Sequence, residues 1–513
     1  MRLKSNILKL ALFATGLSGI VAEYILSTLA TYFLGDSVFQ WTMIISVMLF
    51  SMGLGSRLSK YFTTDLLKKF IIIEFSLSLL TSFSSLLAYS AAAYTVYTGL
   101  IIYTLSIIIG LMIGMEIPLV VRLNNEFESL KVNISSVLEN DYYGSLLGGM
   151  FFAFIGLPYL GLTYTPFVLG SINFVVAFFL LIILWEHLGN NIRVQLGAGS
   201  GVVTLLLITG VLVAKPIIMF GEQHRYKDKV VFSKQSKYQK IVITQWKDDY
   251  WLFINGNQQL STVDEALYHE PMVHPVMSLS KKPKDVLILG GGDGCAAREV
   301  LKYPSVKGIK LVDLDPVMTD LANEHPMLIN LNNGSLMHPK VEVINQDAYI
   351  FLEQNQGYYD VIIIDLPDPK TIEIGRLYSH EFYQLCKKRL RPHGLIVSQA
   401  GSPYYAWRAF QCVDTTMQSA GFTTVPLHNQ VITLGEWGWI IGAKGISRED
   451  LLVILRGLNF DQIQTKWINH QAMTLITSFG KDFFNYSKDP IEVNTIHNPV
   501  LYKYYLKGKW DLY

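Results

Sequence analysis

Acidic side chains close four short apolar runs in the second half of the chain, and their surroundings suit cationic ligands. The first run leads into "GGGDG", which carries Asp293, and the later runs end near Asp313, near Asp347, and at Asp365 with Asp368. Glycines after a strand let the backbone approach a ligand, which in dinucleotide sites is pyrophosphate. Asp293 would repel such an anion, so it favours a ligand group such as an ammonium.

The later aspartates suit a nucleoside and a second cation. Asp313 has the spacing at which an acidic side chain accepts from ribose hydroxyls, and Asp347 could accept from an adenine amino group. Asp365 and Asp368 follow the fourth run in "IIIDLPDP". One strand-end aspartate is commonly a helix cap or a solvent contact. Four strands ending in carboxylates at one edge instead predict a pocket for a positively charged adenosine and a second cationic molecule.

The elements that must position these residues alternate between strands and helices. Strands are predicted at 285–289, 309–313, 341–344, 361–365 and 395–399, with helical runs between them. Such alternation predicts a parallel α/β sheet of the Rossmann-like type with helices on both faces. A late hairpin, "FTTVPLHNQ" with "EWGWIIGA", is expected to close one edge of this sheet.

A small antiparallel β-sheet is predicted over 229–262, ahead of the parallel sheet. Apolar and polar residues alternate there in short runs, and Asn255-Gly256 is a strong two-residue hairpin signal. The following segment, "VDEALYHEPMVHPVMSL", has helical spacing. Residues 445–513 carry no recognisable chemistry, and their aromatic end is expected to dock against the core.

The first part of the chain is expected to be a multi-pass α-helical membrane domain. The protein has 513 residues, of which 50% are hydrophobic and only 16% are charged, which is too apolar for a purely soluble protein. Seven stretches of spanning length are predicted, at 7–34, 38–57, 70–94, 98–121, 142–163, 165–185 and 195–220. The first is long enough to stay in the bilayer, so a cleavable signal peptide is not expected.

The basic residues give conflicting indications of topology. Ten lysines and arginines lie in the N-terminal segment and the alternate connections, whereas the connections at 35–37, 95–97 and around 164 hold none. This pattern predicts a cytoplasmic N-terminus, and seven spans would then put the second half outside. Yet six basic residues between Arg225 and Lys240 look cytoplasmic by the same rule, so one stretch could be re-entrant.

Three carboxylates, Glu23, Glu74 and Glu116, lie within the apolar stretches. A carboxylate in that environment is a functional candidate unless a bundle neighbour neutralises it or it reaches an interface, and neutralisation is the simpler expectation. Elsewhere, a net charge of +1 gives no bulk electrostatic case for nucleic acid. Three cysteines without a CxxC pair exclude a disulfide framework and a cysteine-rich zinc site, and they fit a reducing compartment.

The motifs resemble those of the spermidine synthases, the polyamine aminopropyltransferases. "GGGDG", "VDLD", "QDA" and "DLPDP" occur in the family's order and spacing over about residues 230–445, after "YQ" (Tyr238-Gln239) and "DEALYHE". With its apolar first half and "GLPYLGL", "GEWGW" and "VNTIHNPVL", the chain is similar to the membrane-anchored bacterial branch. The resemblance implies an S-adenosylmethionine methyltransferase-type fold. It also implies decarboxylated S-adenosylmethionine as donor, a diamine (usually putrescine) as acceptor, and spermidine and methylthioadenosine as products.

The resemblance also implies roles for individual residues. Asp293 faces the donor's aminopropyl ammonium and would repel the carboxylate of ordinary S-adenosylmethionine. The residues implied to hold the adenosine part are Gln239, Asp313, Asp347 and Ala348. Those implied to line the acceptor site are Tyr268, His269, Asp293 and Asp368. Asp365 is implied to be the base that deprotonates the acceptor ammonium, whose pKa is about 10, and neither a metal nor a tightly bound cofactor is implied.

Two departures from the family pattern bear on ligand identity. Asp313 stands where the family usually has glutamate, and Ile432 stands where soluble members have a tyrosine that helps to hold the diamine. A histidine in a helix facing a sheet, such as His269, is also commonly a core residue. Two other functions stay open. One is a methyltransferase using ordinary S-adenosylmethionine, against which Asp293 argues, and the other is a membrane polyamine transporter or sensor whose soluble part only binds.

The resulting expectation is a multi-pass helical membrane domain, then a small antiparallel β-sheet, then a Rossmann-like catalytic domain. The predicted boundaries are 1–221 for the helices, 222–280 for the small sheet with its helix, 281–445 for the catalytic domain and 446–513 for a C-terminal extension. The expected partners are the two small molecules and the lipid bilayer, and a homodimer is compatible with the sequence. The expected location is the inner cell membrane, with the catalytic domain in the cytoplasm because the donor is a cytosolic metabolite.

Overall fold

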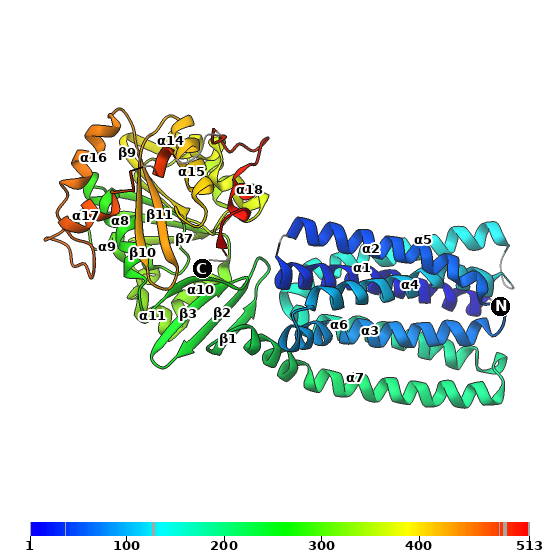
Figure 1. Cartoon of the computed structure of the whole chain (residues 1–513). Helices are drawn as coiled ribbons and strands as arrows, with labels where there is room; N and C mark the ends of the chain where they lie inside the picture. The colour runs from blue at the N-terminus through cyan, green and yellow to red at the C-terminus, as the bar shows by residue number, and fades with distance from the viewer. Residues whose placement is uncertain (1, 36, 126–128, 482, 486–489, 511–513) are drawn as a thin grey trace. The chain divides into compact units, whose positions relative to one another are not determined.

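The chain folds into two compact units, Met1–Val230 and Val231–Tyr513 (Figure 1). The structure is a computed structural model that describes residues 2–35, 37–125, 129–481, 483–485 and 490–510. The first unit is helical, and the second combines helices with two β-sheets. The finer boundaries at 221, 280 and 445 stay predictions.

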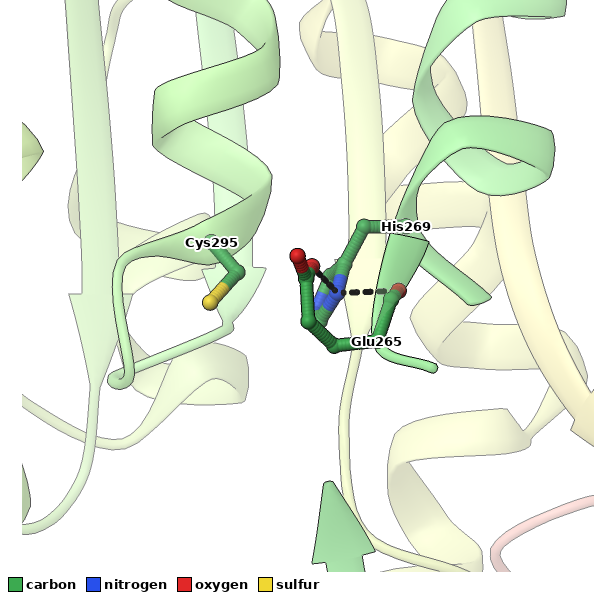
Figure 2. Close-up of side chains that lie close together, drawn as sticks. All are labelled: Glu265, His269 and Cys295. Atoms are coloured by element: carbon green, nitrogen blue, oxygen red, sulfur yellow. Dashed lines mark hydrogen bonds and ion pairs between the residues drawn. The ribbon is translucent and has the colours of Figure 1, made fainter. Parts of the chain in front are cut away.

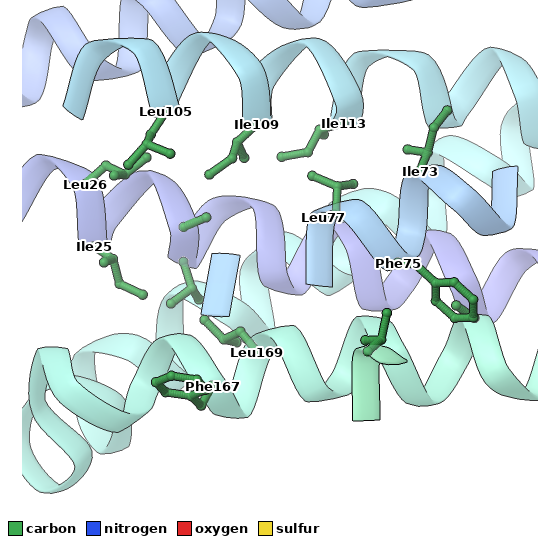
Figure 3. Close-up of a cluster of buried hydrophobic side chains, with 14 of the residues drawn as sticks. Ile25, Leu26, Ile73, Phe75, Leu77, Leu105, Ile109, Ile113, Phe167 and Leu169 are labelled. Atoms are coloured by element: carbon green, nitrogen blue, oxygen red, sulfur yellow. The ribbon is translucent and has the colours of Figure 1, made fainter. Parts of the chain in front are cut away.

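Long apolar helices make up the first unit. They are α1 (Arg2–Leu34), α2 (Ser37–Leu58), α3 (Leu66–Tyr94), α4 (Thr98–Asn124), α5 (Leu130–Phe151), α6 (Gly161–Ile183) and α7 (Asn190–Arg225). Across the described residues, six helical segments are long and apolar enough to cross a membrane, with Leu130–Ile183 taken as one segment. Buried side chains from several helices form one apolar core, drawn in Figure 3 around Ile25, Leu77 and Ile109.

The segment Leu130–Ile183 folds back on itself at Gly161. Gly144 on α5 packs against the backbone of Phe13, while Asn173 on α6 accepts a hydrogen bond from Ser18 at 2.7 Å. A continuous helix would separate residues 144 and 173 by roughly 43 Å, so both could not reach the same turns of α1. Gly161, at a φ of +60°, allows the reversal after the π-helical stretch Phe152–Leu160. The seven predicted stretches thus correspond to α1 to α7.

The second half of the chain leaves the helical unit at the end opposite to residue 2. Near the end of α1, the Tyr32 hydroxyl donates to Glu222, which lies near the end of α7. At the other end, Lys68 at the start of α3 donates to Gln195 at the start of α7 at 3.0 Å. All seven helices have at least 22 residues, enough for roughly 33 Å. Helix length alone therefore singles out no re-entrant stretch among α1 to α7, and that interpretation of the charge pattern stays a prediction.

Two of the three intrahelical carboxylates lie in the same region. Thr15 on α1 donates to Glu74 on α3 at 3.2 Å, and Glu116 on α4 interacts electrostatically with Glu74. Neither oxygen of Glu116 has a hydrogen-bond partner among the described residues. Glu23 lies eight residues beyond Thr15 on α1, about two helical turns away. Glu74 and Glu116 thus form a polar site inside an apolar core, and Glu23 stands apart.

A seven-stranded sheet organises the second unit, in the order β10-β11-β9-β8-β5-β6-β7. The strands are β5 (Asp285–Gly290), β6 (Gly308–Asp313), β7 (Val341–Asn345), β8 (Tyr359–Asp365), β9 (Leu390–Gly401), β10 (Thr423–Val431) and β11 (Gly435–Ala443). β5 to β9 pair in parallel, and the β10–β11 hairpin is antiparallel at one edge. Val286 and Ile288 pack on one face and Leu287 and Leu289 on the other, as strand alternation requires. The predicted Rossmann-like fold is confirmed.

Helices cover both faces of this sheet (Figure 1). They are α8 (Ala266–Leu279), α9 (Cys295–Leu301), α10 (Pro316–Glu324), α11 (Pro326–Asn332), α12 (Ala348–Gln354), α13 (Ile372–Gly375), α14 (His380–Arg389), α15 (Trp407–Ser419), α16 (Arg448–Arg456), α17 (His470–Ile476) and α18 (Leu501–Leu506). The last three belong to the C-terminal segment, which packs against the core as the sequence predicts.

The small sheet comes after the helical unit and before the parallel sheet. It contains β1 (Lys229–Gln235), β2 (Lys240–Trp246), β3 (Asp249–Ile254) and β4 (Asn257–Ser261), in that order. Asn255 and Gly256 take positive φ values of 50° and 78° between β3 and β4, the conformation expected of the predicted hairpin turn.

Candidate active site

Strand pairing brings the acidic strand ends to one edge of the parallel sheet. Gly290 pairs with Asp365 at the ends of β5 and β8, and Asp313 pairs with Asn345 at the ends of β6 and β7. The chain adds β6 and β7 on one side of β5 and then β8 and β9 on the other side. Folds of this type bind ligands at the point where the strand order reverses, which here lies at β5. The glycine turn and the aspartates therefore face the same region.

All nine site residues predicted from the sequence line one cavity of about 280 Å³. They are Gln239, Tyr268, His269, Asp293, Asp313, Asp347, Ala348, Asp365 and Asp368. The cavity is also lined by Gln258 from the small sheet, Gln399 from β9 and Trp437 from β11. The small sheet and the Rossmann-like sheet thus contribute to the same pocket.

The glycine turn is fixed by the aspartate at the end of the next strand. Gly290, Gly291 and Gly294 have φ values of 83°, 66° and 83°, which residues with side chains rarely adopt. Gly292 donates its N–H to Asp313 Oδ2 at 3.1 Å, and a Cβ on Gly292 would lie 2.6 Å from that oxygen. Burial raises the pKa of Asp313 to about 6.

Asp293 occupies the helix end that would otherwise receive an anion. Its Oδ1 accepts a hydrogen bond at 2.7 Å from the N–H of Cys295, the first residue of α9. A helix N-terminus of this kind binds phosphate when its N–H groups are free. Here a resident carboxylate uses one of them and adds negative charge, so the turn suits a cationic ligand group.

His269 carries a positive charge between carboxylates. Its Nδ1–H donates to the Glu265 carboxylate at 3.1 Å and to the Glu265 backbone oxygen at 3.0 Å (Figure 2). Its Nε2 lies 4.0 Å from Asp293 Oδ1. Burial alone would lower the pKa of His269, but the hydrogen bond to Glu265 and the charges of Asp293 and Asp365 raise this pKa to about 9. The ring is therefore cationic and fixed at neutral pH.

Groups of histidine, cysteine and acidic side chains lie close enough to share a metal ion, but their chemistry does not suit one. In the described part of the chain these groups are Glu265–His269–Cys295, His269–Asp293–Asp365 and Glu270–His274–Glu299. Figure 2 shows the first group. Arg298 donates to Glu265 at 2.7 Å and to Glu299 at 2.7 Å, and His269 is itself cationic. Basic side chains thus already pair Glu265 and Glu299, as in a buried ion network, and Glu270 accepts from three backbone N–H groups.

Asp365 is partly buried and has a neutral hydrogen-bond partner. Its Oδ1 accepts from the Tyr268 hydroxyl at 2.9 Å. Burial raises the pKa of Asp365 to about 6, with Asp293 adding to the rise and His269 and Tyr268 opposing it. Burial and the nearby Asp365 raise the pKa of Tyr268, so this hydroxyl stays a donor. Near neutral pH, Asp365 is a carboxylate that can hold a cation and accept a proton.

Asp368 is held by residues that the sequence analysis did not single out. Its Oδ2 accepts from the Tyr505 hydroxyl at 2.6 Å, and its Oδ1 lies 3.4 Å from Gln399 Nε2. Lys370 lies on the loop after β8, with its Nζ 5.6 Å from the centre of the Tyr505 ring. Ile432, at the position implied to help hold a diamine, is 69% exposed and lies outside the cavity lining. The acceptor end of the cavity is thus shaped by other residues.

Asp347 has the structural role that a single strand-end aspartate commonly has. Its Oδ1 caps α12 by accepting from the N–H groups of Tyr349 and Ile350 at 2.9 and 3.2 Å. Its Oδ2 pairs with Arg376. Asp347 and its neighbour Ala348 line the cavity, so a role toward a nucleoside stays a proposal beside the observed capping.

Gln239 is positioned by Ser236 and Asp315, which the sequence analysis did not single out. It lies in the turn between β1 and β2, where its N–H donates to Ser236 Oγ at 2.9 Å. Ser236 in turn donates to Asp315 Oδ2 at 2.7 Å, and Asp315 caps α10 by accepting from Val317 at 3.1 Å. The second aspartate of "VDLD" was the available signal for this link between the small sheet and the Rossmann-like sheet.

Comparison with known proteins identifies relatives along nearly the whole chain. The family described as spermine/spermidine synthase domain matches residues 265–449. Polyamine aminopropyltransferase 2 of Aquifex aeolicus is 40% identical over 508 residues, which cover 98% of this chain and 99% of that protein. The polyamine aminopropyltransferase of Oceanobacillus iheyensis is 38% identical over 501 residues, covering 96% of each chain. The crystal structure of spermidine synthase from Thermotoga maritima is 28% identical, with a TM-score of 0.44, covering 49% of this chain and 85% of that one.

Proposed function

This chain belongs to the polyamine aminopropyltransferase (spermidine synthase) family, and we propose that it makes spermidine from putrescine. It is an aminopropyltransferase, and its donor is decarboxylated S-adenosylmethionine. The choice of putrescine and the residue roles below are the proposal. The observation that carries them is a single cavity in which Asp293, Asp365 and Asp368 lie beside the glycine turn of a Rossmann-like sheet.

The donor end supports a cationic nucleoside. We assign the adenosine part to Gln239, Asp313, Asp347 and Ala348, which line the cavity together. Asp293 faces the donor's terminal ammonium, and the carboxylate of ordinary S-adenosylmethionine in that place would meet a like charge of low exposure. This arrangement supports aminopropyl transfer over methyl transfer.

The acceptor end supports a proton-accepting role for Asp365. The acceptor arrives as an ammonium with a pKa of about 10 and attacks only as the free amine. Asp365 takes one proton from this ammonium before the attack, which frees the lone pair of the nitrogen. The lone pair attacks the carbon beside the sulfonium, the C–S bond breaks toward sulfur, and neutral methylthioadenosine leaves. We assign Tyr268 and Asp368 to holding and aligning the amine, and alignment supplies much of the acceleration. His269 lines the same end of the cavity and is its cation before the amine binds.

Incubation of the purified full chain with each donor and putrescine tests this function. We expect aminopropyl transfer from the decarboxylated donor, and we expect Asp365→Asn to reduce turnover at least a thousandfold while donor binding is retained. Asp360→Asn is the matched control, because Asp360 lies on the same strand and pairs with Arg391 at the other end. Methyl transfer without aminopropyl transfer, or full turnover by Asp365→Asn, would overturn the proposal.

We further propose that the apolar helices anchor the enzyme in the cell membrane with the catalytic unit in the cytoplasm. Six helical segments of the described chain are long and apolar enough to span. The donor is a cytosolic metabolite, which supports this orientation. Residue 2 would then lie on the opposite side, since the chain leaves the helical unit at the other end.

A further inference from the structure

We propose that the C-terminal segment completes the acceptor site, with Tyr505 as the residue that positions Asp368. The proposal rests on the function above, in which Asp368 holds the acceptor amine. Tyr505 lies on α18, 137 residues after Asp368 in the chain, and its hydroxyl donates to Asp368 Oδ2 at 2.6 Å. A segment without recognisable chemistry in its sequence thus contacts Asp368, a residue of the cavity wall.

The segment that carries Tyr505 is firmly attached to the catalytic core. Asn494, which is 1% exposed, donates to the backbone oxygens of Gly375 and Tyr378 at 2.9 and 3.2 Å. Its Oδ1 accepts from the N–H groups of Val500 and Leu501, both at 3.2 Å, at the start of α18. Asn494 therefore ties the start of α18 to the region between α13 and α14 and fixes the helix on the core.

The Tyr505 side chain is equally constrained. It is 2% exposed, and its ring centre lies 4.6 Å from that of Trp510. Trp510 Nε1 donates to the backbone oxygen of Tyr505 at 2.8 Å. A hydroxyl held by both its helix and its ring has little freedom to lose when it binds a carboxylate, so its hydrogen bond is preorganised.

The contact decides which oxygen of Asp368 is presented to the cavity. Oδ2 is taken by Tyr505, whereas the contact of Oδ1 within the described chain is a long one of 3.4 Å to Gln399. Asp368 lines the cavity, so Oδ1 is the oxygen available to an ammonium.

Lys370, two residues after Asp368, contacts two other segments of the chain. Its Nζ lies over the Tyr505 ring, 5.6 Å from the ring centre, and donates to Asn257 of β4 at 2.5 Å. The loop after β8, the small sheet and α18 therefore meet at Lys370, two residues after Asp368. A change in the Tyr505 hydroxyl is expected to act on the acceptor through the Asp368 carboxylate and to leave the donor end untouched.

Tyr505→Phe tests the inference because it removes the hydroxyl and keeps the buried ring. We expect the KM for putrescine to rise about tenfold, which is the loss of one hydrogen bond to a charged group. The KM for the donor and the melting temperature should stay unchanged. Tyr504→Phe is the matched control, since its hydroxyl lies on the same helix and contacts the exposed Glu492 at 3.3 Å. In the Asp368→Asn background, Tyr505→Phe should add little further change.

The outcomes separate this inference from the function on which it rests. If Asp368→Asn raises the KM for putrescine and Tyr505→Phe does not, the role of Tyr505 is refuted. The assignment of Asp368 to the acceptor site would still stand. An equal rise in the KM of both substrates, or a lowered melting temperature, would mark Tyr505 as merely structural and also refute it. An unchanged putrescine KM for Asp368→Asn would instead remove the acceptor assignment itself.

Discussion

Asp347 and Asp365 both follow strands of the parallel sheet, yet their oxygens have different partners. Asp347 caps α12 and pairs with Arg376, so its charge is engaged by the fold. Asp365 accepts from the neutral hydroxyl of Tyr268, and burial raises its pKa to about 6. A buried carboxyl with a raised pKa in a cavity is a candidate for proton transfer. At the residue scale, the hydrogen-bond partners thus give Asp347 a structural role and leave the Asp365 carboxylate able to accept a proton.

The pKa of Asp365 predicts an acid limb in the rate. The carboxylate is the competent form of the base, so kcat/KM for the acceptor should fall about tenfold per pH unit below about pH 6. The folded pKa lies above the ordinary 3.8, so this group stabilises the fold when protonated, and that contribution is lost as pH rises from about 4 to 6. Protonation of Asp365 does not destabilise the fold, so unfolding driven by this group cannot cause the fall in rate at low pH. A pH–rate profile at saturating donor measures it, and a flat profile from pH 5 to 7 would count against Asp365 as the base.

At the element scale, a buried ion network joins the two helices that flank the glycine turn. Arg298 on α9 donates to Glu265 at the start of α8 and to its neighbour Glu299, both at 2.7 Å. His274 on α8 lies 2.7 Å from Glu299 through Nε2. Because Glu265 also binds His269, this network sets where the imidazole stands relative to the turn.

Removal of Arg298 should weaken the second unit strongly. Arg298→Met leaves Glu265 and Glu299 buried without the counter-charge that they share, and breaking a buried ion pair typically costs about 3–5 kcal/mol. The exposed pair of Lys310 with Glu342 gives the control, since Lys310→Met should cost at most about 1 kcal/mol. Denaturant unfolding followed by tryptophan fluorescence compares the two variants, and equal midpoints would contradict the prediction.

The same network makes the second unit sensitive to acid. Burial alone would raise the pKa of Glu265, but His269 and Arg298 lower it to about 2, below the ordinary 4.5. Its contribution to stability is therefore present above about pH 4.5 and lost as pH falls toward 2. Arg298→Met should show a smaller loss of stability over that window than the unchanged protein.

The parts of the fold and site that could be predicted are those encoded by local spacing. Strand periodicity, the glycine turn and the strand-end aspartates are enough to predict that Asp293, Asp313 and Asp365 meet at one edge of a parallel sheet. Tyr505 has no such signal, because its partner Asp368 lies 137 residues away. "VDLD" marks Asp315, but its partner Ser236 lies 79 residues away and has no signal of its own. Such contacts depend on how distant segments pack, which a single sequence does not state.

At the scale of the whole molecule, an odd number of long helices sets the direction of the chain. α1 and α7 end together, so residue 2 and Arg225 lie at opposite ends of the helical unit. If these helices cross a bilayer, the catalytic unit and the N-terminus face opposite sides. The charge rule favours a cytoplasmic N-terminus, whereas a cytosolic donor favours a cytoplasmic catalytic unit, and both cannot hold.

Cysteine labelling in spheroplasts decides between these orientations. Cys295, Cys386 and Cys412 are buried, so their background labelling should be low. With the proposed orientation, an impermeant maleimide should label Lys60→Cys, at the same end as residue 2, and should label Lys237→Cys only after lysis. Both lysines are exposed. The reverse pattern would place the catalytic unit outside and overturn the proposed location.

The imidazolium of His269 changes how the acid-lined cavity meets its ligands. With a pKa of about 9, it is a built-in counter-ion that the cavity already carries in the absence of substrate. A sulfonium and an ammonium entering beside it compete with that charge, so their arrival favours release of the imidazole proton to solvent. The bound cations then take the place of the imidazole proton, so the affinity for both ligands is higher in alkaline than in acidic solution.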